Sequence, residues 1–294
     1  MLKKRRQFTR VDGLLLLLLT TGALYLAYRI KIGLNYRWNW AAIPQFLYRY
    51  DEQSGRWVAN LLVQGLYTTI RLSFWSTGLA TVIGVLTGLC RTSQSLFYRL
   101  LGRFYVEFNR NMPPLVLIII FYYFVSDQVL PLLGFNNFFL YRFAATERFA
   151  TVLFGPPVLF PAFVSAVISL ALFEAAYIAE IVRAGVQSIE KGQWEAGHAL
   201  GLSKWQQLRH VILPQALPRV LPPLAGQFVS VIKDSSIVSV ISIQELTFQG
   251  LELMASTYLT FEIWITITLL YLVLTLSSSL LVRRLELRMA RRAL

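Results

Sequence analysis

Long apolar runs alternate with short polar segments along most of this 294-residue chain. An α-helix needs roughly 17–25 mainly apolar residues to cross a bilayer. Helices also satisfy their own backbone polar groups, which lipid cannot do. The pattern therefore predicts an all-α, polytopic membrane protein with about six transmembrane helices. The predicted spans are residues 14–32, 64–90, 113–133, 159–183, 220–243 and 261–282.

The first span needs separate consideration, because a cleavable signal peptide also has basic residues before an apolar core. Arg29 and Lys31 follow this run, and no small-residue cleavage pattern is present. We therefore expect a retained helix.

The distribution of basic residues predicts the orientation of the chain. With the N-terminus in the cytoplasm, the inner segments hold nineteen Lys and Arg residues and the outer segments hold seven. Cytoplasmic loops of membrane proteins carry an excess of Lys and Arg. Both termini are therefore expected to lie in the cytoplasm.

Composition agrees with the membrane prediction. Apolar residues make up 56% of the chain and charged residues 15%, whereas soluble domains carry about a quarter charged residues. The net charge of +13 is gathered beside the apolar runs, so it indicates topology and not a nucleic-acid partner. Cys90 is the single cysteine, which excludes an intrachain disulfide, and two histidines are too few for a zinc site. No phosphate-loop motif is present, so ATP would have to bind to another chain.

The segment 184–218 is the longest predicted inner segment and has the most specific pattern. It contains the letters GQWEAGHALGLS over residues 192–203 and VILP over 211–214. Gly201 readily takes a positive φ and is expected to separate two short helices. Ser203 is expected to cap the second helix and Pro214 to close it. A short helix that exposes Glu195 and Leu200 is well shaped to dock in a groove of another protein.

The spacing of Glu195-Ala196-Gly197, Gly201 and Leu213-Pro214 resembles the EAA motif of ABC importer permeases. Three other segments resemble the polar amino acid branch of that family. They are AYIAEIVRAG at 176–185, NMPP at 111–114 and KDSS at 233–236. The resemblance covers about residues 60–285.

This resemblance implies a type I ABC importer permease fold in the bacterial inner membrane and a transport subunit that is not an enzyme. The implied function is ATP-driven import of polar amino acids by alternating access. The segment at about 193–204 would be the coupling helix that contacts the ATPase. Its implied ATPase-coupling residues are Glu195, Ala196, Gly197, Ala199, Leu200, Gly201, Leu202 and Ser203.

The resemblance also implies partners. These are a second permease subunit, identical or paralogous, an ATPase dimer that binds ATP and Mg, a periplasmic amino-acid-binding protein and the substrate itself. No cofactor or metal is expected on this chain.

Two departures from the family pattern stand out. Gly197 replaces the second alanine of the motif and is expected to loosen packing slightly, and an extra helix precedes the usual five. We therefore assign residues 1–60 to that extra helix with a periplasmic surface segment, and 61–294 to the permease core.

Ionisable and hydroxyl side chains within the predicted spans are candidate substrate-pathway residues, since charges at membrane depth are rare and need a reason. These candidates are Arg71, Glu174, Tyr177, Lys233, Asp234, Ser235 and Ser236. Lys233 and Asp234 could bind the carboxylate and ammonium of an amino acid, with helix breaks near Pro222-Pro223 exposing backbone groups. An internal ion pair is the alternative.

The other intramembrane charges also have two interpretations each. Glu174 could bind a substrate ammonium or be a buried structural acid. Arg71 could snorkel outward or attract a substrate carboxylate. Glu180 and Arg183 are expected to form an intrahelical pair.

Three other functions remain open at this stage. A permease of the same class could carry another solute, such as an opine or a small peptide-like compound. An ion-coupled secondary transporter would act without an ATPase and usually has internal repeats, which this sequence lacks. A structural membrane scaffold would not explain the spacing between Glu195 and Pro214.

Overall fold

The structure, a computed structural model, describes residues 10–33, 36–53, 55–132 and 147–292. It forms two compact units, Met1–Trp40 and Ala41–Leu294, which we describe separately. The first unit contains α1 (Arg10–Gly33), where a helix was predicted at 14–32. The sequence-based division into an N-terminal segment, 1–60, and a permease core, 61–294, concerns function and stays a prediction.

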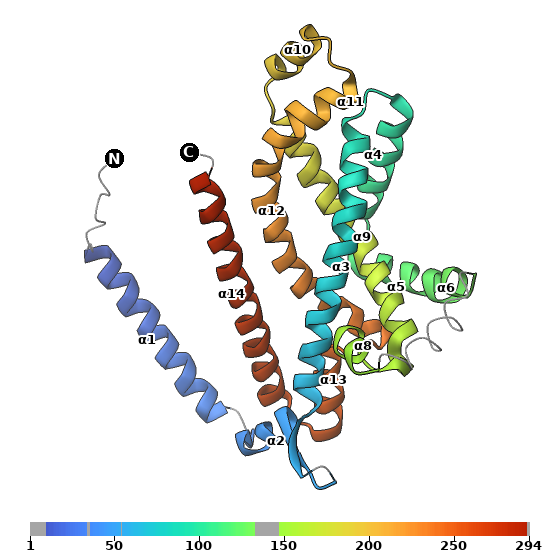
Figure 1. Ribbon diagram of the computed structural model, residues 1–294. Coiled ribbons are helices and arrows are strands. Elements are labelled where there is room, and N and C mark those ends of the chain that lie inside the picture. The colour runs from blue at the N-terminus through green and yellow to red at the C-terminus, as the bar shows by residue number, and fades with distance from the viewer. Residues whose placement is uncertain (1–9, 34–35, 54, 133–146, 293–294) are drawn as a thin grey trace. The chain divides into compact units, whose positions relative to one another are not determined.

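The second unit is almost entirely helical (Figure 1). Its longer helices are α3 (Leu61–Thr92), α4 (Leu96–Asn111), α5 (Pro114–Phe124), α9 (Phe160–Gln187), α12 (Leu213–Asp234), α13 (Leu246–Thr257) and α14 (Thr260–Arg292). The shorter helical elements are η1 (Trp40–Ala42, which begins at the unit boundary), α2 (Ile43–Leu47), η2 (Val125–Val129), α6 (Leu130–Leu132), α8 (Glu147–Phe154), η3 (Pro157–Leu159), α10 (Lys191–Ala199), α11 (Lys204–Gln207), η4 (Leu208–Ile212) and η5 (Ser235–Ile241).

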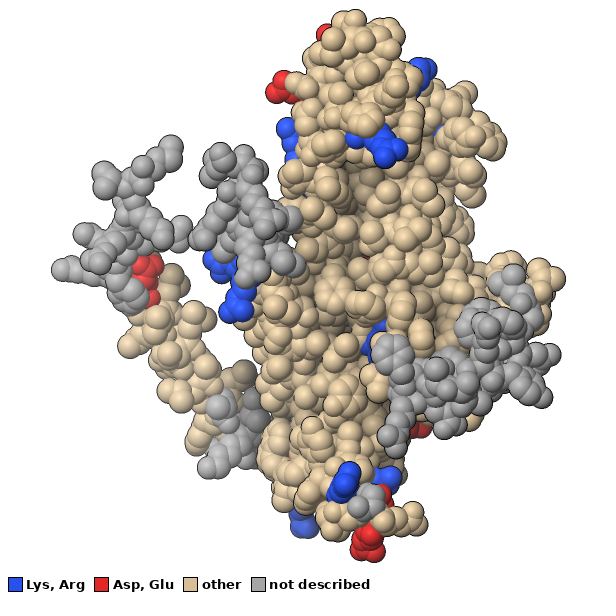
Figure 2. All heavy atoms as spheres, in the orientation of Figure 1, with Lys and Arg blue, Asp and Glu red and all other residues tan. Residues whose placement is uncertain are grey.

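The prediction of about six membrane helices is confirmed. Within the described residues, five stretches are long and apolar enough to cross a membrane, and α1 is a further apolar helix. The five stretches are Leu61–Thr92, Pro114–Leu132, Pro157–Gln187, Lys204–Ile241 and Thr260–Arg284. On the face drawn in Figure 2, most of the surface is neither basic nor acidic, and Lys and Arg side chains gather near the two ends of the second unit with smaller groups between them.

Helix α9 is the central helix of the second unit, and most of its side chains are buried. Small residues allow α3 to approach it closely. A Cβ atom on Gly84 would lie 2.6 Å from Cβ of Ile178, and one on Gly88 would lie 2.7 Å from Cβ of Val182. Glycine lets helix backbones pack tightly in lipid, where dispersion contacts replace the hydrophobic effect between helices. This contact fixes the helix on which Glu174 and Glu180 lie.

A two-stranded antiparallel hairpin interrupts the helical pattern, where the sequence predicted only a surface segment. Strand β1 (Tyr48–Asp51) pairs with β2 (Arg56–Ala59), and Tyr50 faces Trp57 across the ladder. The rings of Tyr50 and Trp57 are 5.8 Å apart, and such cross-strand aromatic pairs stabilise a hairpin. Four-residue strands are too short to give a clear alternating pattern in the sequence.

Pro214 does not close a helix, so that prediction was wrong. It lies in the first turn of α12, and the helical stretch runs without a break from Lys204 to Ile241. Because the helix continues through Pro214, the proline removes one backbone hydrogen bond there, and the helix accommodates this beside a π-helical segment instead of ending. The π-helical segment η4 precedes it and continues the helix from α11.

The expected helix break near Pro222 and Pro223 is also wrong. Both prolines lie inside α12, which continues to Asp234. Leaving the helix within lipid would orphan further backbone N–H and C=O groups, whereas a proline removes only its own N–H. The backbone instead changes at the 3₁₀ segment η5, which is followed by Ser242 in the left-handed conformation with φ 59°.

Candidate functional site

The short helix α10 lies at one end of the second unit, opposite the β1–β2 hairpin (Figure 1). Gly197 is its one fully buried residue, and Trp194 is partly buried. Glu195 is exposed, and Leu200, which follows the helix, is 79% exposed. An exposed leucine on a helix turn is suited to contact with another protein.

The turn between α10 and α11 has the predicted local structure. Gly201 has φ +72°, the conformation that favours glycine. The Ser203 hydroxyl accepts a hydrogen bond from the Gln206 N–H at 3.4 Å, and Gln206 Oε1 accepts one from the Ser203 N–H at 2.9 Å. This is a capping box. The predictions for Gly201 and Ser203 are therefore confirmed as structure, while their part in coupling stays a prediction.

Gly197 tightens this turn, contrary to the expectation that it loosens packing. The side chain of Gln207 lies against Gly197, and its amide donates a hydrogen bond to the Trp194 carbonyl. A Cβ atom at Gly197 would lie 2.8 Å from Nε2 and 2.9 Å from Cγ of Gln207. The glycine therefore makes room for the contact that joins α11 to α10.

We expect Gly197→Ala to loosen the α10–α11 turn. Overpacking costs about 1–3 kcal/mol, and the new methyl group would displace Gln207 from Trp194. Hydrogen exchange of the α10 amides should become faster by about tenfold, since 1.4 kcal/mol corresponds to that factor. The matched control is Gly192→Ala, because an added Cβ there meets nothing within 4 Å. Equal exchange in the two variants would contradict this packing role.

Three candidate pathway residues meet on the inner faces of α9 and α12. Glu174 is completely buried, and Gln227 Nε2 donates a hydrogen bond to its Oε2 at 2.7 Å. The carboxyl group of Asp234 comes close enough to interact with that of Glu174, and Tyr177 lies near both. Glu174 Oε1 is buried and has no hydrogen-bond partner within the described part of the chain. Two close carboxyl groups, one with an unused acceptor, form a site that a cation would complete.

Lys233 and Ser236 also line a separate surface feature. They line an open pocket together with Thr247, Trp264 and Tyr271. Lys233 belongs to none of the ion pairs formed by the described side chains, so the alternative of a tight Lys233–Asp234 pair is not seen.

The two candidate serines are used locally. The Ser235 hydroxyl donates to the Ile232 carbonyl at 2.8 Å, and the Ser236 hydroxyl donates to the Lys233 carbonyl at 2.7 Å. These bonds satisfy carbonyls where α12 changes into η5. Their hydroxyl protons are therefore not directed at a substrate in this conformation.

Arg71 has a partner that neither interpretation of the sequence included. Its Nε donates to the Val152 carbonyl at 2.7 Å, and Trp75 Nε1 donates to the Leu153 carbonyl at 3.1 Å. Both carbonyls lie in the last turn of α8, where a positive charge is favourable. Arg71 also lines a small pocket of about 50 Å³ with Thr68, Ser242 and Gln244.

Two polar residues were missed by sequence reasoning. Gln227 gives no sequence signal, because its partner Glu174 is 53 residues away. Glu245 is completely buried. It accepts hydrogen bonds from the Phe248 N–H at 2.8 Å and the Tyr271 hydroxyl at 2.7 Å. Burial raises the pKa of Glu245, although these donors oppose the rise. An acid directly before an apolar run is a helix-start signal that could have identified it.

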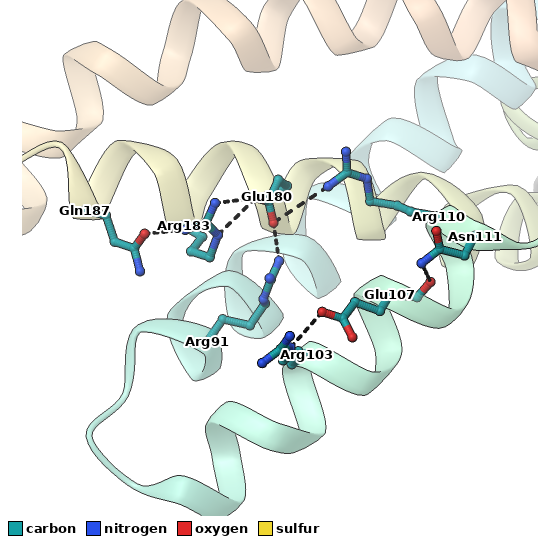
Figure 3. Close-up of polar contacts among 8 residues, drawn as sticks. All are labelled: Arg91, Arg103, Glu107, Arg110, Asn111, Glu180, Arg183 and Gln187. Carbon is teal, nitrogen blue, oxygen red and sulfur yellow. Dashed lines mark hydrogen bonds and ion pairs between the residues drawn. The ribbon is translucent and has the colours of Figure 1, made fainter.

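The predicted Glu180–Arg183 pair is confirmed and belongs to a larger network (Figure 3). Arg91 at the end of α3 also donates to Glu180. Nη1 of Arg110, in α4, lies 3.9 Å from Glu180 Oε2. The guanidinium carbon of Arg110 is 5.8 Å from the Tyr177 ring centroid. One carboxylate therefore connects α3, α4 and α9, which sequence spacing could not predict.

Known proteins resemble this chain over most of its length. The family model described as "Binding-protein-dependent transport system inner membrane component" matches residues 80–291. The glutamine transport system permease protein GlnP of Escherichia coli (strain K12) is 38% identical over 239 residues, which cover 81% of this chain and 97% of that protein. The probable glutamine ABC transporter permease protein GlnM of Bacillus subtilis (strain 168) is 33% identical over 230 residues, 78% of this chain and 94% of that protein.

A solved structure agrees with these sequence relatives. The crystal structure of an amino acid ABC transporter with histidines matches with a TM-score of 0.63 and 28% sequence identity. The match covers 86% of this chain and 100% of that chain.

Proposed function

We propose a function for this chain from the premise that it belongs to the family of binding-protein-dependent transport system inner membrane components. In this proposal the chain imports polar amino acids with the energy of a separate ATPase. The relatives named above are called glutamine transport permeases, and the matching structure is that of an amino acid transporter. Family membership does not favour the alternative of an ion-coupled secondary transporter.

The exposed α10–α11 turn is the observation that carries the coupling proposal. Glu195 and Leu200 project from the end of the bundle and are exposed, while Gly197 and Gln207 hold the turn together from inside. In this proposal the turn docks in a groove of the ATPase, so that closure of the ATPase moves α9 and α12. The ATPase dimer binds ATP and Mg, and this chain makes no covalent bond.

The proposed orientation places α10 and both termini in the cytoplasm. The excess of Lys and Arg in the inner segments supports it. The β1–β2 hairpin, at the opposite end of the second unit (Figure 1), would then face the periplasm and the amino-acid-binding protein. A second permease subunit, identical or paralogous, would complete the transport pathway.

The carboxyl groups of Glu174 and Asp234 are the proposed partners of the substrate ammonium. A bound ammonium would take the unused acceptor Oε1 of Glu174 and offset the mutual repulsion of the two acids. Gln227 holds the other oxygen of Glu174 and so orients the carboxylate. Alternating access would expose this pair first to the periplasm and then to the cytoplasm.

Uptake of labelled glutamine by proteoliposomes tests the proposed function. The vesicles would contain this chain, its second permease and the ATPase, with the binding protein added outside. We expect uptake only with ATP, the ATPase and the binding protein all present, and competition by other polar amino acids. Uptake that persists without the ATPase would overturn the proposal in favour of a secondary transporter.

A further inference from the structure

We propose that a basic cleft beside α10 binds the headgroup of an anionic phospholipid. The cleft is open, has an empty volume of about 660 Å³, and lies between the end of α3, the start of α4, the end of α9 and the start of α10. Its main polar lining residues are Arg91, Thr92, Ser93, Arg99, Gln187 and Lys191. The volume is sufficient for a phosphate group with its glycerol.

The charge of the cleft points to an anion. Arg91, Arg99 and Lys191 come from three different helices, and no acidic side chain is among the lining residues. Arg91 forms an ion pair with Glu180, which does not line the cleft. Arg99 and Lys191 belong to none of the ion pairs of the described residues. Basic pockets between membrane helices bind lipid phosphates, with about 1 kcal/mol for each Lys or Arg near the surface.

One hydroxyl group adds a neutral donor to these cations, since the Thr92 hydroxyl already donates to the Leu89 carbonyl. The Ser93 hydroxyl oxygen accepts a hydrogen bond from the Ser95 N–H at 3.2 Å, which leaves its proton available to a ligand. Trp194 also lines the cleft and is partly buried. Tryptophan is enriched at the level of lipid headgroups, where its apolar ring and polar N–H are both satisfied.

The outer face of α4 distinguishes a lipid from a soluble phosphate compound. Phe97, Leu101, Phe104 and Phe108 follow one another at helical spacing and are all exposed. They form an apolar stripe about half a turn around α4 from Arg99, so the stripe faces away from the cleft, although Phe97 lies only two residues from Arg99 along the helix. The opposite face of α4 is already buried in the bundle, so this stripe is available to acyl chains. Because the stripe begins at Phe97, lipid reaches the level of Arg99, and the headgroup of a neighbouring phospholipid can enter the cleft.

Binding at this cleft would join the α3–α4 corner to α10. Lys191 is the first residue of α10, and Arg99 lies in the first turn of α4. An anionic headgroup between them would restrain the helix that we propose to contact the ATPase. This inference concerns lipid binding, and its test does not depend on transport.

Native mass spectrometry can test the inference on the full-length chain released from vesicles of equal parts phosphatidylglycerol and phosphatidylcholine. We expect phosphatidylglycerol to be retained in preference to phosphatidylcholine. The double variant Arg99→Gln/Lys191→Gln should lower the retained phosphatidylglycerol about tenfold or more, because two headgroup contacts are lost. The matched control Arg103→Gln/Lys204→Gln removes the same charge outside the cleft and should retain the lipid.

Each outcome bears on the proposal. Loss of lipid in the cleft variant alone supports it, while equal retention or equal loss in the two variants overturns it. Inorganic phosphate and glycerol phosphate serve as soluble competitors, and displacement of the lipid by either would overturn the lipid assignment in favour of a soluble phosphate ligand. Gel filtration of each variant verifies that the chain is folded.

Discussion

Glu195→Ala and Gly201→Asp are each expected to lower ATP-driven amino acid uptake at least tenfold while the chain remains folded and inserted. Glu195 is exposed and forms none of the ion pairs of the described residues, so its removal should act mainly on contacts with a partner. Truncating a charged group at a protein interface typically costs about 2–5 kcal/mol, and about 1.4 kcal/mol already corresponds to tenfold.

The effect of Gly201→Asp has a different physical cause. A side chain at φ +72° costs roughly 1–2 kcal/mol, and a change of this backbone angle would move the neighbouring Leu200 and Leu202. Uptake and ATP hydrolysis would be measured in the same vesicles. The control is Glu190→Ala, an exposed acid beside α10 whose side chain forms no capping bond. Normal uptake in the Glu195 and Gly201 variants, or equal loss in the control, would contradict the coupling role.

Glu174→Gln and Asp234→Asn are expected to lower uptake about tenfold or more without lowering thermal stability. The amide of Gln at position 174 can still accept a hydrogen bond from Gln227, so the packing of α9 against α12 is kept. The ligand for the substrate ammonium loses its charge, and hydrogen bonds to charged groups contribute about 1.5–3 kcal/mol. Uptake kinetics and thermal unfolding of each variant give the two readouts.

Glu245→Gln is the matched control for these variants. Glu245 is also completely buried, but its oxygens already accept hydrogen bonds from Phe248, Tyr271 and Thr69. We expect this variant to lose stability and to keep its substrate preference. If Glu174 were a purely structural acid, Glu174→Gln would leave uptake unchanged, and the proposed ammonium site would be wrong.

Local features of this chain could be predicted from the sequence because their causes are local. The left-handed glycine at 201 and the cap at Ser203 depend on neighbours within three residues. The membrane helices follow from long apolar runs in the same way. The intrahelical pair of Glu180 and Arg183 also needs only helical spacing.

Features that depend on distant partners could not be predicted. The contact of Gly197 with Gln207, the bond between Gln227 and Glu174, and the approach of Arg91 to Glu180 all join separate elements. The effect of the α12 prolines was predicted wrongly for a related reason. Their local effect is to break a helix, but lipid penalises the loss of the other backbone hydrogen bonds more strongly.

Photo-crosslinking in the assembled complex tests the coupling proposal most directly. A benzophenone amino acid would replace Leu200, which is 79% exposed, or Trp57, which is 70% exposed on the hairpin at the opposite end of the second unit. We predict a covalent product with the ATPase from position 200 and none from position 57. A product with the ATPase from position 57, or from neither position, would contradict the assignment of the α10–α11 turn as the ATPase contact.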